Sequence, residues 1–186
     1  MKSILAIAAL VLLSFVADAQ TLSNEVIDAR IKSARAENNI SLDFDAAGGS
    51  TKFMAVSENF SKGDADRSGI LAMNFALGVI YPGSSLAKTP ESFLLTFWVL
   101  SKKPRFGANH AMTVTVGDEM LVIGSARYSG NPREQMEYLN FEISRENLRK
   151  IASEANVEFQ LGEQRFAFTK SQIRLIEEVL VVTEVR

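Results

Sequence analysis

Oxygen-bearing residues in segment 64–69 are the nearest approach to a ligand-binding motif in this chain of 186 residues. Asp64, Asp66 and Ser68 alternate before a glycine, which is how a calcium loop folds its oxygen ligands around the ion. The twelfth position of such a loop requires a carboxylate, but Phe75 occupies it here. The same residue types are typical of a solvated hairpin tip. We therefore expect no cofactor, and calcium at Asp64, Asp66 and Ser68 is the alternative.

A basic loop flanked by aromatic residues is the second candidate site. The loop covers residues 101–110, and cations from residues 127–133 lie near it if the predicted strands pair. Arginine and lysine supply charge and aromatic rings supply a stacking face, so such a set would hold an anionic glycan, a lipid headgroup or a carboxylate. The alternative is a solvated loop at the end of a sheet. The candidate ligand-binding residues are Lys102, Lys103, Arg105, His110, Arg127, Tyr128 and Arg133.

Signatures of familiar enzymes are missing from the sequence. There is no cysteine and a single histidine, His110, which excludes thiolate chemistry and multi-histidine metal sites. No Gly-x-Ser-x-Gly elbow, phosphate loop or His-Glu-x-x-His motif is present. Asp43 and Asp45 share one strand face and form a candidate pair for glycoside hydrolysis, although their predicted outer position favours solvation. Trp98, in the most apolar strand, is predicted to belong to the core.

These absences favour a non-catalytic protein that binds a ligand or a partner, while leaving enzymatic activity open. The alternatives are a carboxylate-based hydrolase acting on glycans and a structural component of the cell envelope. With 20 basic and 22 acidic residues the net charge is −2, so there is no electrostatic argument for nucleic acid as a partner. We expect the partner to be an unidentified envelope component or an anionic small ligand.

Residues 1–19 have the three parts of an export signal. Lys2 gives a positive start, residues 4–16 form an apolar run, and Ala17-Asp18-Ala19 matches the small-x-small pattern of a signal-peptidase site. Because a secreted animal domain of this size would usually carry disulfides, we expect a periplasmic or secreted bacterial protein. No transmembrane segment is expected after cleavage. The remaining residues 20–186 are predicted to form one domain, in which 39–143 and 144–186 are candidate sub-structures.

Alternation with a period of two dominates the middle of the chain, which indicates β-strands. A short helix, capped by Thr21 or Ser23, is predicted within residues 21–37. A type II′ turn at Gly117-Asp118 is predicted to join two strands into a hairpin, and 129–135 is a predicted loop. The predicted strands are 40–45, 51–57, 71–81, 93–100, 112–116, 120–126, 136–143 and 157–161.

Two of these strands carry information about their surroundings. In 71–81 the odd positions are large and apolar, whereas Ala72, Asn74, Ala76 and Gly78 on the other face are small. This pattern predicts a core on one side and something packed closely on the other. The strand 93–100 is apolar on both faces, which predicts a central strand covered on both sides.

The last third of the sequence contains an internal repeat. Residues 141–151 and 166–176 align without gaps, and in each an alternating strand ends at a hydroxyl that can cap a helix. Thr169-x-x-Gln172 fits a capping box. The predicted class is therefore α+β: a mostly antiparallel sheet, sandwich-like or a meander, with an N-terminal helix and two C-terminal helices in a strand–helix–hairpin–helix arrangement.

Overall fold

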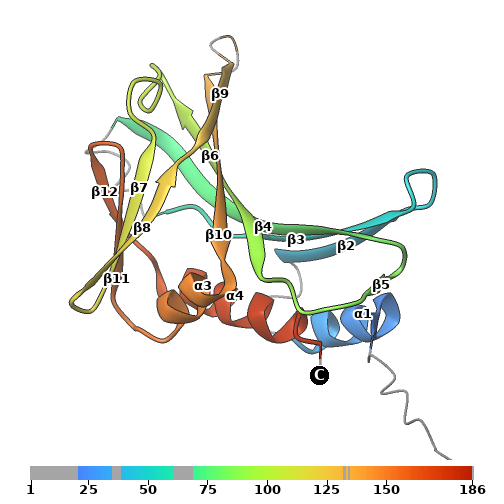
Figure 1. Ribbon diagram of the computed structural model, residues 1–186. Helices are drawn as coiled ribbons and strands as arrows, with labels where there is room; N and C mark the ends of the chain where they lie inside the picture. Colours follow the sequence, from blue (N-terminus) through green and yellow to red (C-terminus); the bar gives the residue numbers. More distant parts are fainter. Residues whose placement is uncertain (1–20, 35–38, 61–68, 132, 134, 186) are drawn as a thin grey trace, which may run out of the picture.

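The protein consists of antiparallel sheets with helices packed along one side (Figure 1). The computed structural model describes residues 21–34, 39–60, 69–131, 133 and 135–185. Within these residues there is one helix near the N-terminus and two towards the C-terminus, which confirms the predicted α+β class. The predicted signal peptide, residues 1–19, lies outside the described residues.

Half of the described strands belong to a six-stranded antiparallel sheet. Most of its neighbouring strands follow one another in the chain, because short turns join antiparallel strands directly, whereas the step from β6 to β10 is a crossover. The order across this sheet is β2 (Ile40–Asp45), β3 (Ser50–Val56), β4 (Ile70–Pro82), β6 (Ser92–Ser101), β10 (Met136–Ser144) and β9 (Arg127–Asn131).

A four-stranded sheet continues from the edge of the six-stranded sheet. Its order is β12 (Gln164–Ala167), β11 (Val157–Leu161), β7 (Ala111–Val116) and β8 (Glu119–Ser125). Only Ala126 separates β8 from β9, so the chain passes from one sheet to the other at this residue. The predicted hairpin turn is confirmed: Val116 pairs with Glu119, and Gly117 has a φ of +58°, which a glycine adopts without steric cost. A short pair, β1 (Leu22–Ser23) and β5 (Ser85–Leu86), completes the strands.

Each helix begins at a side chain that satisfies a free backbone N–H. Ser23 caps α1 (Asn24–Ser33), Ser144 caps α3 (Arg145–Ala152), and Thr169 caps α4 (Lys170–Val182). The predicted capping box is present, because Gln172 N donates to Thr169 Oγ1 and Thr169 N donates to Gln172 Oε1. Such caps stabilise helix starts by about 1 kcal/mol each.

Two arginines donate hydrogen bonds to the carbonyl groups at the C-terminal end of α4. Arg30 Nη1 donates to the carbonyl oxygens of Val181 and Val182, at 3.3 and 3.2 Å. The buried Arg145 donates to the carbonyl of Leu180 and to Thr183 Oγ1. The last carbonyls of a helix have no partner within the helix, and the macrodipole there favours cations. Arg30 from α1 and Arg145 from α3 therefore bind all three helices together.

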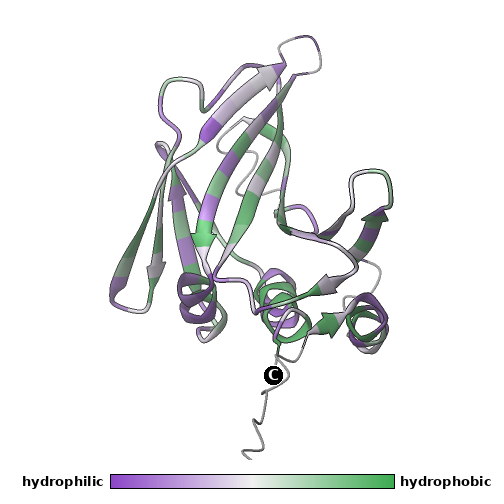
Figure 2. Ribbon diagram, turned by 45° about the vertical axis from the view of Figure 1, so that its right-hand side comes forward, coloured by the Kyte–Doolittle hydropathy of each residue, from purple (hydrophilic) through white to green (hydrophobic). Residues whose placement is uncertain are grey.

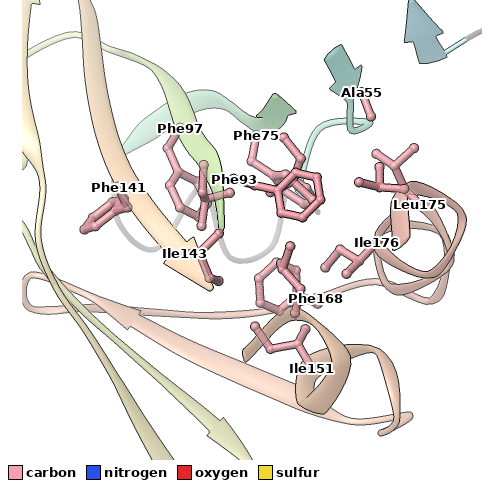
Figure 3. Packing of buried hydrophobic residues seen from close by; sticks show 14 of the residues in the cluster. Ala55, Phe75, Phe93, Phe97, Phe141, Ile143, Ile151, Phe168, Leu175 and Ile176 are labelled. Carbon is pink, nitrogen blue, oxygen red and sulfur yellow. The ribbon is translucent and has the colours of Figure 1, made fainter. Parts of the chain in front are cut away.

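The core lies between the six-stranded sheet on one side and the helices and the four-stranded sheet on the other. Figure 3 shows Phe75, Phe93 and Phe97 of the six-stranded sheet near Phe168, Ile151 and Ile176. Phe75 and Phe97 have no exposed surface, and their ring centroids lie 6.1 Å apart. Burial of aromatic side chains on this scale is the main source of stability of the fold.

The two units of the internal repeat have the same local structure. Both run from a strand through a hydroxyl N-cap into a helix, with Ser144 and Thr169 in equivalent places. Phe141 and Phe166 are both buried, whereas Arg149 and Arg174 both face solvent, as the pattern predicts. The strand–helix–hairpin–helix order is confirmed. Because β11 pairs with β7, the C-terminal unit shares a sheet with the preceding strands.

Three local predictions were wrong. Leu71 was predicted to face the core but is 52% exposed, because the pairing of β4 with β6 shifts between Ile70 and Ala72 and turns it outwards. Residues 129–135 were predicted as a loop, yet 127–131 form the edge strand β9. The alternation over residues 40–45 predicts a half-buried strand with Phe44 on its apolar face, but Phe44 is 47% exposed because β2 is the outer strand of the sheet.

Candidate functional site

The outer face of the six-stranded sheet, opposite the helices, holds a groove of about 940 Å³. The groove is lined by residues of β3, β4, β6, β10 and β9, mainly those that project from the outer face, and by two residues of β8. Figure 2 shows hydrophobic residues interspersed with hydrophilic ones along these strands. A volume of this size is that of a site for a small molecule. The side chains that line the groove are those of Lys52, Met54, Ala76, Ile80, Ser92, Leu94, Thr96, Trp98, Ile123, Ser125, Arg127, Ser129, Tyr138, Asn140 and Glu142.

Strand register arranges these side chains in rows across the sheet. Ala76 pairs with Thr96, Thr96 with Asn140, and Asn140 with Arg127. Residues that pair directly in an antiparallel sheet project from the same face. This sequence of pairs, the central row, therefore crosses β4, β6, β10 and β9 at right angles to the strands.

Taller side chains stand on both sides of the central row. Trp98 pairs with Tyr138 in the row on one side, and Leu94 pairs with Gly78 in the row on the other. Neighbouring rows are about 7 Å apart, because two residues separate them along each strand. Leu94 is 51% exposed and Ile80, farther along β4, is 68% exposed. The groove thus presents apolar surface that nothing in the described part of the chain covers.

The predictions for β4 and β6 are only half right here. Their inner faces are buried, but the outer face of β6 is open, so Trp98 lies in the groove and outside the core. The small residues Ala76 and Gly78 were expected to have something packed closely behind them. Ala76 is 4% exposed, so neighbouring side chains cover most of it, whereas Gly78 is half-buried, and both residues line the groove.

The groove has no pair of carboxylates among the residues that line it. Its single acid is Glu142, and Ser92 Oγ donates a hydrogen bond of 2.8 Å to Glu142 Oε1. Glycoside hydrolysis requires two carboxyl groups about 5–10 Å apart. Asp43 and Asp45 are exposed on β2 and do not line the groove. Asp45 Oδ1 accepts a hydrogen bond from Ala47 N, as an aspartate in a turn does.

Glu137 organises the basic loop that the sequence singled out. This glutamate is 2% exposed, and its carboxylate accepts hydrogen bonds from Arg105 N at 2.8 Å and Phe106 N at 2.9 Å. Ser101 Oγ and Tyr128 Oη also donate to it, at 3.1 and 3.2 Å. Four donors compensate for burial of the charge. Sequence reasoning missed Glu137, although the alternation of β10 places it on the same face as the buried Leu139 and Phe141, which is a signal that it faces inwards.

Tyr128 and His110 meet beside this carboxylate. Their rings stack with centroids 5.9 Å apart and an angle of 21° between the planes. Burial raises the pKa of the Tyr128 hydroxyl, and the neighbouring Glu137 carboxylate raises it further. The structure therefore brings His110, Tyr128 and the backbone of Arg105 together around Glu137.

The remaining cations of the predicted set are dispersed. Lys102, Lys103 and Arg133 are exposed, and the backbone N–H of Arg133 donates to Asn131 Oδ1 at 3.1 Å. Arg127 lies on the opposite face of the sheet from Tyr128, in the groove. Neighbouring strand residues project from opposite faces, so Arg127 and Tyr128 cannot contact one ligand together.

The predicted calcium ligands Asp64, Asp66 and Ser68 lie outside the described residues, so the expectation that they hold no ion stays a prediction. Among the described residues, no cluster of three or more histidine, aspartate or glutamate side chains is arranged to hold a metal ion. None of the described helices is both long enough and apolar enough to span a bilayer.

Comparison with protein-family models, with curated protein sequences and with solved structures gives no match to this chain.

Proposed function

We propose that this protein is a non-catalytic binding protein, and that the outer groove takes a small ligand with an extended apolar part. The observation that carries this proposal is a set of apolar side chains left open on both sides of the low central row. Leu94 and Ile80 on one side are more than half exposed, and Trp98 on the other side is half-buried. Leaving such side chains in water costs about 25 cal/mol for each Å² of apolar surface, and a ligand that covers them recovers this free energy.

Binding is favoured over hydrolysis by the contents of the groove. The described residues place one carboxylate there, Glu142, and none of the paired acids that a glycan hydrolase uses. A binding site needs only apolar surface with a few polar groups to orient the ligand. Arg127, at one end of the central row, supplies such a polar group.

The cell envelope is the proposed location, either in the periplasm or outside the cell. Support comes from the pattern of Lys2, the apolar run over residues 4–16 and Ala17-Asp18-Ala19. The absence of cysteine agrees with a bacterial origin. An apolar ligand crossing an aqueous compartment needs a carrier, which gives the groove a role there.

Trp98 provides a direct test, because it is the single tryptophan of the chain and lies in the groove. Dodecanol, an uncharged acyl-chain compound, is titrated into the protein below its solubility limit while tryptophan emission is recorded. We expect a saturable shift of emission to shorter wavelength as the alcohol displaces water from Trp98. Unchanged emission together with no heat of binding in calorimetry would refute the proposal.

A pair of variants separates binding in the groove from binding elsewhere. Leu94→Ser removes an apolar side chain from the groove wall, and we expect about tenfold weaker dodecanol binding. Val122→Ser is the matched control, because Val122 is 71% exposed on β8 and is not among the residues that line the groove. Equal loss of affinity in both variants would place the ligand elsewhere.

A further inference from the structure

We propose that the ligand of the groove is an acyl chain that ends in a carboxylate, laid across the strands with the carboxylate at Arg127. This inference rests on the proposed function and adds the class and orientation of the ligand. It is carried by three features of the central row, namely its profile, the hydrogen bonds within its floor, and the charge at one end.

The profile of the groove is that of a furrow across the sheet. The low residues Ala76, Thr96 and Asn140 lie in register between taller side chains, Trp98 and Tyr138 on one side and Leu94 on the other. Adjacent strands are about 4.8 Å apart, so the furrow runs about 14 Å from β4 to β9. A shape of this kind suits one extended chain lying across the strands.

The polar atoms in the furrow floor already have partners. Thr96 Oγ1 donates to Asn140 Oδ1 at 2.8 Å, and Asn140 Nδ2 donates to the backbone carbonyl oxygen of Arg127 at 3.4 Å. A glycan would need free donors and acceptors at the floor to replace the water lost from its hydroxyls. A hydrocarbon chain makes no such demand, and Leu94 and Trp98 offer it apolar walls.

Charge is unequal between the two ends of the furrow. At the β9 end, no ion pair or hydrogen bond of the Arg127 guanidinium is found within the described residues. At the β3 end, the residue that pairs with Ala76 is the apolar Val56. Lys52 pairs with Ile80, which lies two rows away from Ala76 on β4.

Glu142 is the one charge in the groove that opposes an anion. Its carboxylate is bound by Ser92 of β6, on the side of β10 that faces away from β9. Arg127 is therefore left to meet the ligand. An arginine presents a planar pair of N–H donors that match a carboxylate, which makes it the natural partner for such a head group.

The test compares dodecanoate with dodecanol at neutral pH and low salt, following Trp98 emission and heat of binding. We expect the intact protein to bind dodecanoate about tenfold more tightly than dodecanol. Arg127→Gln should abolish this preference by weakening dodecanoate binding, while dodecanol binding stays unchanged. Arg133→Gln, which removes an exposed arginine outside the groove, should leave both affinities unchanged.

The possible outcomes separate this inference from the function on which it rests. If both compounds bind equally, or if Arg127→Gln weakens both to the same degree, the carboxylate assignment fails and the apolar groove stands. If neither compound binds, the proposed function fails as well. Binding to vesicles that contain anionic phospholipid, without binding of monomeric dodecanoate, would overturn the inference in favour of a membrane surface.

Discussion

The buried Glu137 carboxylate accepts a hydrogen bond of 2.9 Å from the backbone N–H of Phe106, and so fixes the loop between β6 and β7 to β10, the strand next to the edge of the sheet. The same carboxylate also accepts Arg105 N, Ser101 Oγ and Tyr128 Oη. This cluster lies on the inner face of the sheet, opposite the groove. Its role is to hold the strands that carry the groove on their other face.

Glu137→Gln tests this role. An amide group keeps one oxygen acceptor, but its NH₂ confronts either Arg105 N or Phe106 N, both of which are donors. We expect the free energy of unfolding to fall by about 2 kcal/mol in urea denaturation. Trypsin should also cleave faster at the exposed Lys102 and Lys103.

The matched control is Glu142→Gln on the same strand. Its carboxylate is exposed and accepts one hydrogen bond, from Ser92. We expect a change in stability of less than about 0.5 kcal/mol. Equal destabilisation by the two substitutions would contradict the structural role of Glu137.

Tyr128 should make stability depend on alkaline pH. Because its pKa is raised in the folded protein, the fold holds the phenol proton more tightly than the unfolded chain does. The resulting stability is present below the ordinary tyrosine pKa of about 10 and is lost as the pH rises through the raised pKa. Urea denaturation at increasing pH should therefore show a steeper loss in the intact protein than in Tyr128→Phe. Parallel curves would show that the hydroxyl is not perturbed.

Arg145→Met should destabilise the protein strongly. The side chain is 5% exposed and satisfies the carbonyl of Leu180 and the hydroxyl of Thr183 at the end of α4. Its loss removes a partner of the Leu180 carbonyl and one of the two partners of the Thr183 hydroxyl, which still donates to Val179 O. We expect a cost of about 3 kcal/mol in thermal or urea unfolding. Arg149→Met, on the exposed face of the same helix, should change stability by less than about 0.5 kcal/mol. A similar loss of stability in both variants would show that the buried hydrogen bonds of Arg145 do not account for the effect.

Export is tested by expression of the full chain in a bacterium with fractionation of the cells. Protein recovered from the periplasm or the medium should have an N-terminus near Gln20, because Ala17-Asp18-Ala19 matches a signal-peptidase site. Intact protein that begins at Met1 and stays in the cytosol would contradict the proposed location.

Local features of the fold were predictable from sequence because they depend on residues close together in the chain. The caps at Ser144 and Thr169 and the turn at Gly117 are of this kind. The alternation in β4 likewise identified its buried face, with Leu71 as the exception caused by a bulge. Each rests on a rule of spacing that needs no knowledge of distant residues.

Properties that depend on distant residues were not predictable. Apolar residues on both faces of β6 predicted that both faces are covered, which was wrong for the outer face. Only the placement of the helices decides that Trp98 faces the groove. The polar strand β9 exists because β10 offers it an edge for pairing. Burial of Glu137 depends on a loop that begins at Lys102, far from it in the chain.

The most direct test of the groove as a binding site is dodecanol titration of the Gly78→Leu variant. A Cβ at position 78 would lie 3.4 Å from its nearest neighbour, the carbonyl oxygen of Phe53, so the sheet has room for a side chain that projects into the groove. Because glycine weakens a strand, we expect the variant to be at least as stable as the intact protein.

The decisive comparison is the affinity of this variant against that of Thr115→Leu, which adds a leucine to an exposed position on β7 outside the groove. We predict that Gly78→Leu weakens dodecanol binding about tenfold or more, at unchanged or higher stability, while Thr115→Leu binds like the intact protein. Equal, tight binding of dodecanol by the intact protein and by Gly78→Leu would contradict the account. The added leucine would occupy part of the groove, so dodecanol would then have to bind elsewhere.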